Sequence, residues 1–206
     1  MYIPVNGDVY CTDGRCGRST TVILNPLTDK VTHVVVAERG LLGIEHIVPL
    51  DQVVETTPAS IHLRISAADL AKLDPFVEAH FIGVDEPYDD YESGTWVLWP
   101  YMVPEDGWLP MVAEEKIPPG ELAIHRDAAV YATDGRIGCV DEFLVEPTTG
   151  YISHLVLREG HLWGQKDVTI PVAQIDKFDD DAVHLKLDKQ HVAALPHIPV
   201  RRKAAP

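Results

Sequence analysis

The chain has few cysteines, few basic residues and no long apolar run. Three cysteines among 206 residues exclude a dense disulfide framework and make a cysteine-rich zinc site unexpected. Seventeen basic against 32 acidic residues give a net charge of −15. This charge argues against a nucleic-acid surface and against adsorption to anionic lipid, because both need clustered Lys and Arg. Without a membrane span or a signal-peptide pattern, we expect a cytoplasmic protein that does not insert directly into a membrane.

The usual catalytic and nucleotide-binding motifs are missing as well. The sequence contains no Walker loop, no Gly-x-Gly-x-x-Gly, no His-Glu-x-x-His and no Gly-x-Ser-x-Gly. We therefore expect no catalytic residue, no cofactor and no bound metal, and we interpret the protein as not being an enzyme.

What the sequence does contain is an internal repeat. The segment Val9–Gly17 returns 121 positions later as Val130–Gly138, and the match continues with one inserted residue as far as Leu195. A near-constant offset over so many positions indicates two copies of one domain. The expected organisation is a first repeat at 1–76, a connecting strap at 77–120, a second repeat at 121–199 and a basic tail at 200–206.

Each repeat consists of short strands divided by turns. The Asp-Gly pairs at 13–14 and 134–135 predict two-residue hairpin turns, each followed by a glycine suited to a bulge. About six strands and one short terminal helix per repeat predict an all-β fold with minor α content, arranged as two small barrels in tandem. The strands at 31–38 and 152–159 are apolar on both faces. We expect their second faces to pack the two barrels together about a pseudo-twofold axis.

One pair of cysteines lies close in sequence. With a turn at 13–14, Cys11 and Cys16 would face each other as a non-hydrogen-bonded pair, at a separation that permits a disulfide. A reducing cytoplasm favours free thiols, and the second repeat has Ala132 and Ile137 at these positions. We therefore expect thiols, with the disulfide as the alternative.

The connecting strap is rich in aromatic, proline and acidic residues. A disordered linker would be poor in aromatics, so we expect an ordered strap that lays its rings on the barrels. Exposure to a partner is the alternative, because clustered surface aromatics mark binding sites. The candidate partner-binding residues are rings of the strap and two loop residues of the second repeat: Tyr88, Tyr91, Trp96, Trp99, Tyr101, Trp108, His161 and Trp163.

Six polar residues recur at matched positions: His33, His154, His62, His184, Glu38 and Glu159. No close His/Cys/Asp spacing points to a metal, so we interpret the histidines as structural, hydrogen-bonded in the core or at the seam between the repeats. For the glutamates we expect bonds to turn amides or to Arg15 and Arg136. Metal binding and a general-base role are the less favoured alternatives.

Finally, the succession Thr-Asp-Gly-Arg-x-Gly, Pro-x-Thr, His-Leu-Val-Leu-Arg-Glu-Gly and Ile-Pro-Val-x-x-Ile resembles the PRC-barrel family, best between Val130 and Leu187. That family includes the cytoplasmic domain of the photosynthetic reaction-centre H subunit and the C-terminal domain of the ribosome maturation factor RimM. The resemblance implies a small barrel used as an adaptor or assembly module, and it supplies no catalytic residues. It also implies, as alternatives, a reaction-centre-associated role with contact to a membrane-bound complex, or an RNA-processing accessory role.

We therefore expect a non-catalytic scaffold whose partner is another protein or a second copy of this chain in a homodimer. The alternative is a ligand- or metal-binding sensor, or a weak enzyme, with its site between the barrels around His33 and His154.

Overall fold

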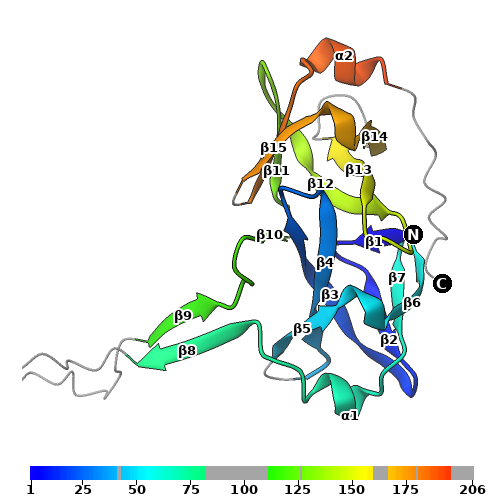
Figure 1. Ribbon diagram of the computed structural model, residues 1–206, viewed down its shortest axis with the longest axis vertical. Coiled ribbons are helices and arrows are strands. Elements are labelled where there is room, and N and C mark those ends of the chain that lie inside the picture. The colour runs from blue at the N-terminus through cyan, green and yellow to red at the C-terminus, as the bar shows by residue number, and fades with distance from the viewer. Residues whose placement is uncertain (41–42, 82–110, 126, 160–166, 180, 196–206) are drawn as a thin grey trace, which may run out of the picture. The chain divides into compact units, whose positions relative to one another are not determined.

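A computed structural model describes residues 1–40, 43–81, 111–125, 127–159, 167–179 and 181–195 (Figure 1). Within these residues the chain is mostly β, with two seven-stranded sheets, one two-stranded sheet and two short α-helices. The chain divides into two compact units. One joins Met1–Phe76 with Ile117–Pro206, and the other is Val77–Lys116. No helix in the described part is both long and apolar enough to span a bilayer.

The smaller unit contains one antiparallel pair, β8 (Val77–Phe81) and β9 (Met111–Glu115). Lys116 Nζ lies 2.8 Å from Glu78 Oε2 across the base of the pair. The strap residues proposed as partner-binding fall at 82–110, and His161 and Trp163 fall at 160–166. All eight candidate partner-binding residues therefore lie outside the described residues.

The first repeat forms one sheet with the strand order β5-β4-β3-β2-β7-β6. Its pairs are antiparallel except β2 with β7, which is parallel. A 3-10 turn, η1 (Leu50–Gln52), precedes β6, and the short helix α1 (Ala67–Leu70) follows β7. The strands are β2 (Asp8–Cys11), β3 (Gly14–Asn25), β4 (Lys30–Glu38), β5 (Glu45–Pro49), β6 (Val53–Thr57) and β7 (Ser60–Leu63).

The second repeat forms a sheet with the equivalent order, β14-β13-β12-β11-β16-β15, and the equivalent parallel pair is β11 with β16. The turn η2 (Val172–Gln174) precedes β15, and helix α2 (Lys189–Ala193) follows β16. The strands are β11 (Ala129–Ala132), β12 (Gly135–Val145), β13 (Ile152–Glu159), β14 (Asp167–Pro171), β15 (Ile175–Asp179) and β16 (Ala182–Leu185).

The seventh strand of each sheet comes from the other repeat. Strand β1 (Tyr2–Pro4) pairs with β12, and strand β10 (Leu122–His125) pairs with β3 (Figure 1). The exchange is reciprocal, because Ile3 lies opposite Phe143 and Ile124 lies opposite Val22. Ile124 is the repeat equivalent of Ile3, and Phe143 is the repeat equivalent of Val22, each 121 positions later. Both isoleucines are fully buried, so each repeat completes its sheet and its core with a strand of the other.

This exchange corrects the expected packing of the two most apolar strands. In the first repeat, the second apolar face of β4 is not covered by β13. Its Val35 packs instead with Phe76, Ala123 and Ile117, and Ala123 belongs to the exchanged strand β10. At its start, β4 lies beside the turn that precedes β13, where Val31 N donates to Gly150 O at 2.9 Å.

The hairpin turns lie one residue earlier than the Asp-Gly pairs predict. Cys11 pairs with Gly14, so the two turn residues are Thr12 and Asp13, and Gly14 follows with a φ of 130°. The register then shifts between Val9 and Tyr10, which makes Cys16 the extra residue of a β-bulge. Next to it, a Cβ on Gly17 would collide with the carbonyl of Ala37. The second repeat has the same register shift.

The turn aspartates also cap the helices, which the sequence did not reveal. Asp13 Oδ1 accepts from Ala67 N at 3.0 Å, and Asp134 Oδ1 accepts from Lys189 N at 3.0 Å. Each helix also has its own N-cap residue, Ser66 for α1 and Asp188 for α2. A side-chain oxygen from the hairpin thus satisfies a helix N–H that would otherwise lack an acceptor.

Candidate functional site

A row of three side chains crosses the sheet of the first repeat. Arg15 on β3 lies opposite Tyr10 on β2, and Tyr10 lies opposite His62 on β7. The tyrosine and histidine rings are stacked, with centroids 5.0 Å apart and planes inclined by 11°. Both rings are half-buried, while Arg15 is exposed. Because side chains on directly paired residues share one face of a sheet, the three form a continuous surface, here called the first row.

The second repeat carries the same arrangement, here called the second row. Arg136 lies opposite Tyr131, and Tyr131 lies opposite His184. The rings are again stacked, with centroids 5.4 Å apart and an inclination of 14°. Tyr131 is 36% exposed. The parallel pairing of β2 with β7, and of β11 with β16, therefore brings residues from distant parts of each repeat into one surface.

The two rows differ in charge at both ends. In the first row, Asp8 Oδ1 accepts from Arg15 Nη2 at 2.6 Å, and Glu55 lies opposite His62. In the second row, Ala129 replaces the aspartate, and Lys177 lies opposite His184.

A further cation stands near the second row. A Cβ placed on Gly135 would lie 3.3 Å from Lys189 Nζ, so this ammonium group sits beside Gly135 at the hairpin tip. A hydrogen bond to Asp179 raises the pKa of Lys177, so its ammonium group remains charged. The second row thus has Arg136 and Lys177 beside Asp179, whereas the first row has Arg15 beside Asp8 and Glu55. The second row is the more cationic surface of the two.

The matched histidines do not share one environment. His62 and His184 lie on partly exposed faces against tyrosine, and not in the core. His33 is at the junction with the strand-exchange segment, where its Nδ1 lies 3.0 Å from Thr32 Oγ1 and 3.5 Å from Glu121 Oε2. His154 is half-buried on β13.

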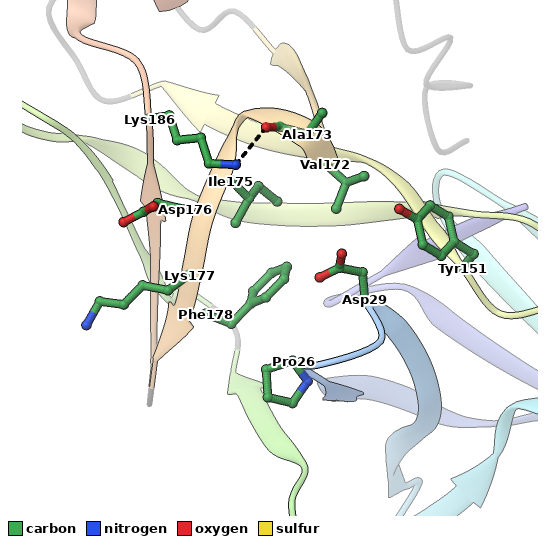
Figure 2. Close-up of a pocket in the computed structure, with 10 residues that line it drawn as sticks. All are labelled: Pro26, Asp29, Tyr151, Val172, Ala173, Ile175, Asp176, Lys177, Phe178 and Lys186. Atoms are coloured by element: carbon green, nitrogen blue, oxygen red, sulfur yellow. Dashed lines mark hydrogen bonds between the residues drawn. The ribbon is translucent and has the colours of Figure 1, made fainter.

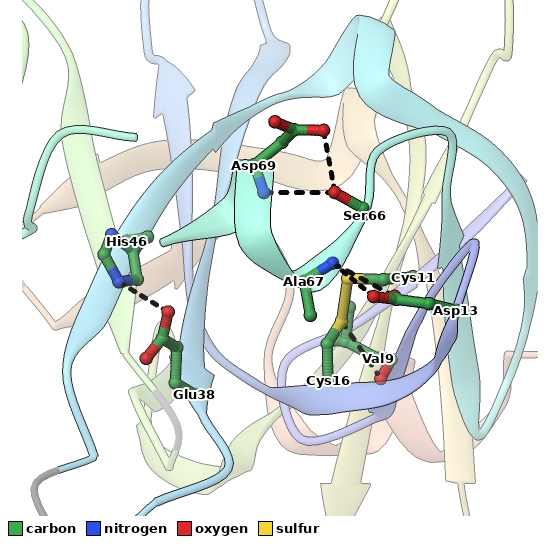
Figure 3. Close-up of a disulfide and its surroundings, with 9 residues drawn as sticks. All are labelled: Val9, Cys11, Asp13, Cys16, Glu38, His46, Ser66, Ala67 and Asp69. Atoms are coloured by element: carbon green, nitrogen blue, oxygen red, sulfur yellow. Dashed lines mark hydrogen bonds and ion pairs between the residues drawn. A yellow bond between two sulfur atoms is a disulfide. The ribbon is translucent and has the colours of Figure 1, made fainter. Parts of the chain in front are cut away.

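Glu38 pairs with a histidine and not with Arg15. Its Oε1 lies 3.1 Å from Nε2 of His46 (Figure 3). Nδ1 of the same ring lies 3.0 Å from the carbonyl of Leu73. The expected bond between Glu38 and Arg15 is therefore wrong. His46 is buried at 4% exposure, and at the equivalent place the second repeat has Val168.

Cys11 and Cys16 are joined by a disulfide, with Cα atoms 5.7 Å apart (Figure 3). The expectation of free thiols is therefore wrong for this pair. The sequence predicted that Cys11 and Cys16 face each other across a turn at 13–14. In the structure the turn lies at 12–13, and the bulge brings Cys16 beside Cys11. Cys139 is a free cysteine.

A recess of about 310 Å³ opens where the repeats meet (Figure 2). His33 and His154 do not line it, and its lysines are already bonded. Lys186 Nζ donates to the Ala173 carbonyl at 3.0 Å, and Lys177 Nζ donates to Asp179 at 2.7 Å. The lining residues are Pro26, Asp29, Tyr151, Val172, Ala173, Ile175, Asp176, Lys177, Phe178 and Lys186. Among the described residues, no three His, Cys, Asp or Glu side chains are placed to hold a metal ion.

Comparison with known proteins identifies a domain class for part of the chain. Residues 126–192 match the model of the PRC-barrel domain, a span that contains strands β11–β16 and nearly all of α2. No curated protein matches the chain.

Proposed function

We propose that the protein is a non-catalytic adaptor built from two PRC-type barrels in tandem, and that the two Arg–Tyr–His rows are its docking surfaces. The observation that supports this is the recurrence of one exposed or half-buried side-chain row, in one cross-strand register, on both sheets. The turn and the bulge explain why the repeated motif contains glycines and aspartates, but they do not explain its arginine, tyrosine and histidine. A binding role explains these residues, because Tyr and Arg contribute much of the binding energy at protein interfaces.

The charge of the second row favours an acidic partner surface. Arg136 and Lys177 lie at the two ends of the row formed by its stacked rings, and a guanidinium group beside an aromatic face suits a carboxylate-bearing protein segment. In the first row, Arg15 already forms an ion pair with Asp8. We therefore assign the tighter contact to the second row.

A small-ligand site in the recess between the repeats is the second candidate. The recess is near the lower limit of volume for ligand pockets. Both of its lysines already donate to protein oxygens, and one of them, Lys177, is also part of the second row, so the recess offers a ligand no lysine without a protein partner.

The test is affinity purification of the full chain from its native cell, comparing Tyr131→Ser with Tyr151→Ser. Tyr151 is a matched control, because it is 40% exposed against 36% for Tyr131 but lines the recess. Loss of an interface hot spot lowers affinity by about 30-fold or more, so Tyr131→Ser should deplete the recovered partner while Tyr151→Ser retains it. Equal recovery with both variants, or selective loss with Tyr151→Ser, contradicts the docking role of the second row.

A further inference from the structure

The hairpin of the first repeat is tied to its surroundings at several points around the disulfide. Asp13 caps α1 at Ala67 N (Figure 3). Thr12 N donates to the Ile65 carbonyl at 3.0 Å, and Arg39 N donates to the Cys16 carbonyl at 2.9 Å. A change in the position of either sulfur is therefore transmitted to the start of α1 and to the end of β4.

The second repeat shows that this backbone does not need a disulfide. Ala132 and Ile137 stand where the first repeat has Cys11 and Cys16, and the register shift is the same. The bond also closes a ring of only a few residues, with a sequence separation of 5. Short rings constrain the unfolded chain least, so the bond contributes little as a staple.

We propose that Cys11 and Cys16 form a reversible dithiol–disulfide site whose redox state changes the conformation at the tip of the β2–β3 hairpin. Bonded sulfurs are about 2.05 Å apart, whereas atoms in van der Waals contact lie roughly 3.5 Å or more apart. Reduction must therefore separate the two sulfurs by about 1.5 Å. Both residues are 7% exposed, and a close-packed interior does not absorb such a shift without movement. The bulge is the part of the hairpin best able to move.

The second repeat has no such change in side-chain separation, because its hairpin holds a small alanine beside a larger isoleucine. The first repeat, with two equal side chains, has two hairpin geometries and passes between them by redox chemistry. Tyr10 and Arg15 flank the cysteines directly, so the first row changes with the redox state while the second row does not.

The chemistry requires a small dithiol as reductant. One of its thiolates attacks one sulfur of the pair, forms a mixed disulfide and releases the other cysteine, which takes up a proton. The second thiol of the reductant then attacks the mixed disulfide, frees the remaining cysteine as a thiol and leaves as a cyclic disulfide. Two electrons and two protons pass to the protein. A small disulfide such as oxidised glutathione reverses the reaction. Cys139 does not compete, because burial and the nearby Asp127 raise its pKa and so limit its thiolate.

The test uses the folded full chain with dithiothreitol at neutral pH. Alkylation and mass measurement should count one free thiol before treatment and three after it, since the chain holds three cysteines of which Cys139 is free. Hydrogen exchange should then be faster by about tenfold at amides 11–16 and at the start of α1, as expected for a locally opened segment. Amides 132–137 of the same molecule should not change, and oxidised glutathione should restore the first state.

The control is the double variant Cys11→Ala with Cys16→Ile, which gives the first hairpin the pair found in the second. Its amide hydrogens should exchange at the rates of the oxidised protein, and dithiothreitol should not change these rates. The proposal is overturned if the folded protein resists reduction, if reduction leaves exchange at 11–16 unchanged, or if both hairpins respond equally. None of these readouts involves a partner, so they stand or fall separately from the docking role.

Discussion

The two repeats share strand order, register shifts and the Arg–Tyr–His row, yet they differ beneath and beside that row. The first repeat has a disulfide under its hairpin, a buried His46–Glu38 pair and an aspartate on its row arginine. The second has Ala132, Val168 and Ala129 at the corresponding places. The shared features belong to the backbone and to one surface row. The first repeat therefore has a disulfide and a buried histidine where the second has alanine and valine, and the surface row of the second repeat is the more cationic.

The largest expected effect is at the exchanged strands, where the two repeats should behave alike. Ile3→Ala and Ile124→Ala each empty a fully buried site and should each cost about 2–5 kcal/mol of unfolding free energy. Chemical denaturation of the full chain measures both. Leu27→Ala, at a residue 91% exposed, is the control and should change stability by less than about 0.5 kcal/mol. A neutral result for either isoleucine would show that the exchange is not equivalent in the two directions.

The next effect separates the repeats. Glu38→Ala removes the carboxylate that lies 3.1 Å from Nε2 of the buried His46 ring and should cost about 1–3 kcal/mol, because it leaves a buried polar ring without a compensating group. His46→Val, which copies Val168, removes the polar ring itself and should cost less. Thermal or chemical unfolding of the two variants gives the comparison. A larger loss for His46→Val would mean that the ring matters by its volume and not by its pairing.

The smallest effect is a pH dependence at the cap of α2. Hydrogen bonds from His191, first from its backbone N–H and then from its ring, lower the pKa of Asp188. The carboxylate thus stabilises the folded state above its ordinary pKa, and this contribution disappears as the pH falls through the lowered value. Asp188→Asn keeps a capping oxygen but does not titrate, so its stability should decline less steeply in acid. Acid-unfolding curves of the two proteins with identical slopes would refute this.

The surface row illustrates what could and could not be predicted about the candidate site. Tyr10, Arg15 and His62 all recur at matched positions, so the sequence marked each of them. It did not show that they are neighbours, because Tyr10 and His62 are 52 residues apart and meet only through a parallel strand pair. The helix-capping role of Asp13 was missed for the same reason, since Ala67 lies 54 residues away.

By itself, the sequence determined that the protein is mostly β and that its strands occur in two matched sets. Hydrophobic alternation and turn residues involve only a few neighbouring positions, so strands and turns can be predicted from the sequence. Only the tertiary structure decided which strands are neighbours. Ile3 and Ile124 complete each other's repeats, and Cys16 reaches Cys11 through a bulge. Such contacts depend on lateral strand order and on burial, because a strand pairs with whichever edge also covers its apolar side chains.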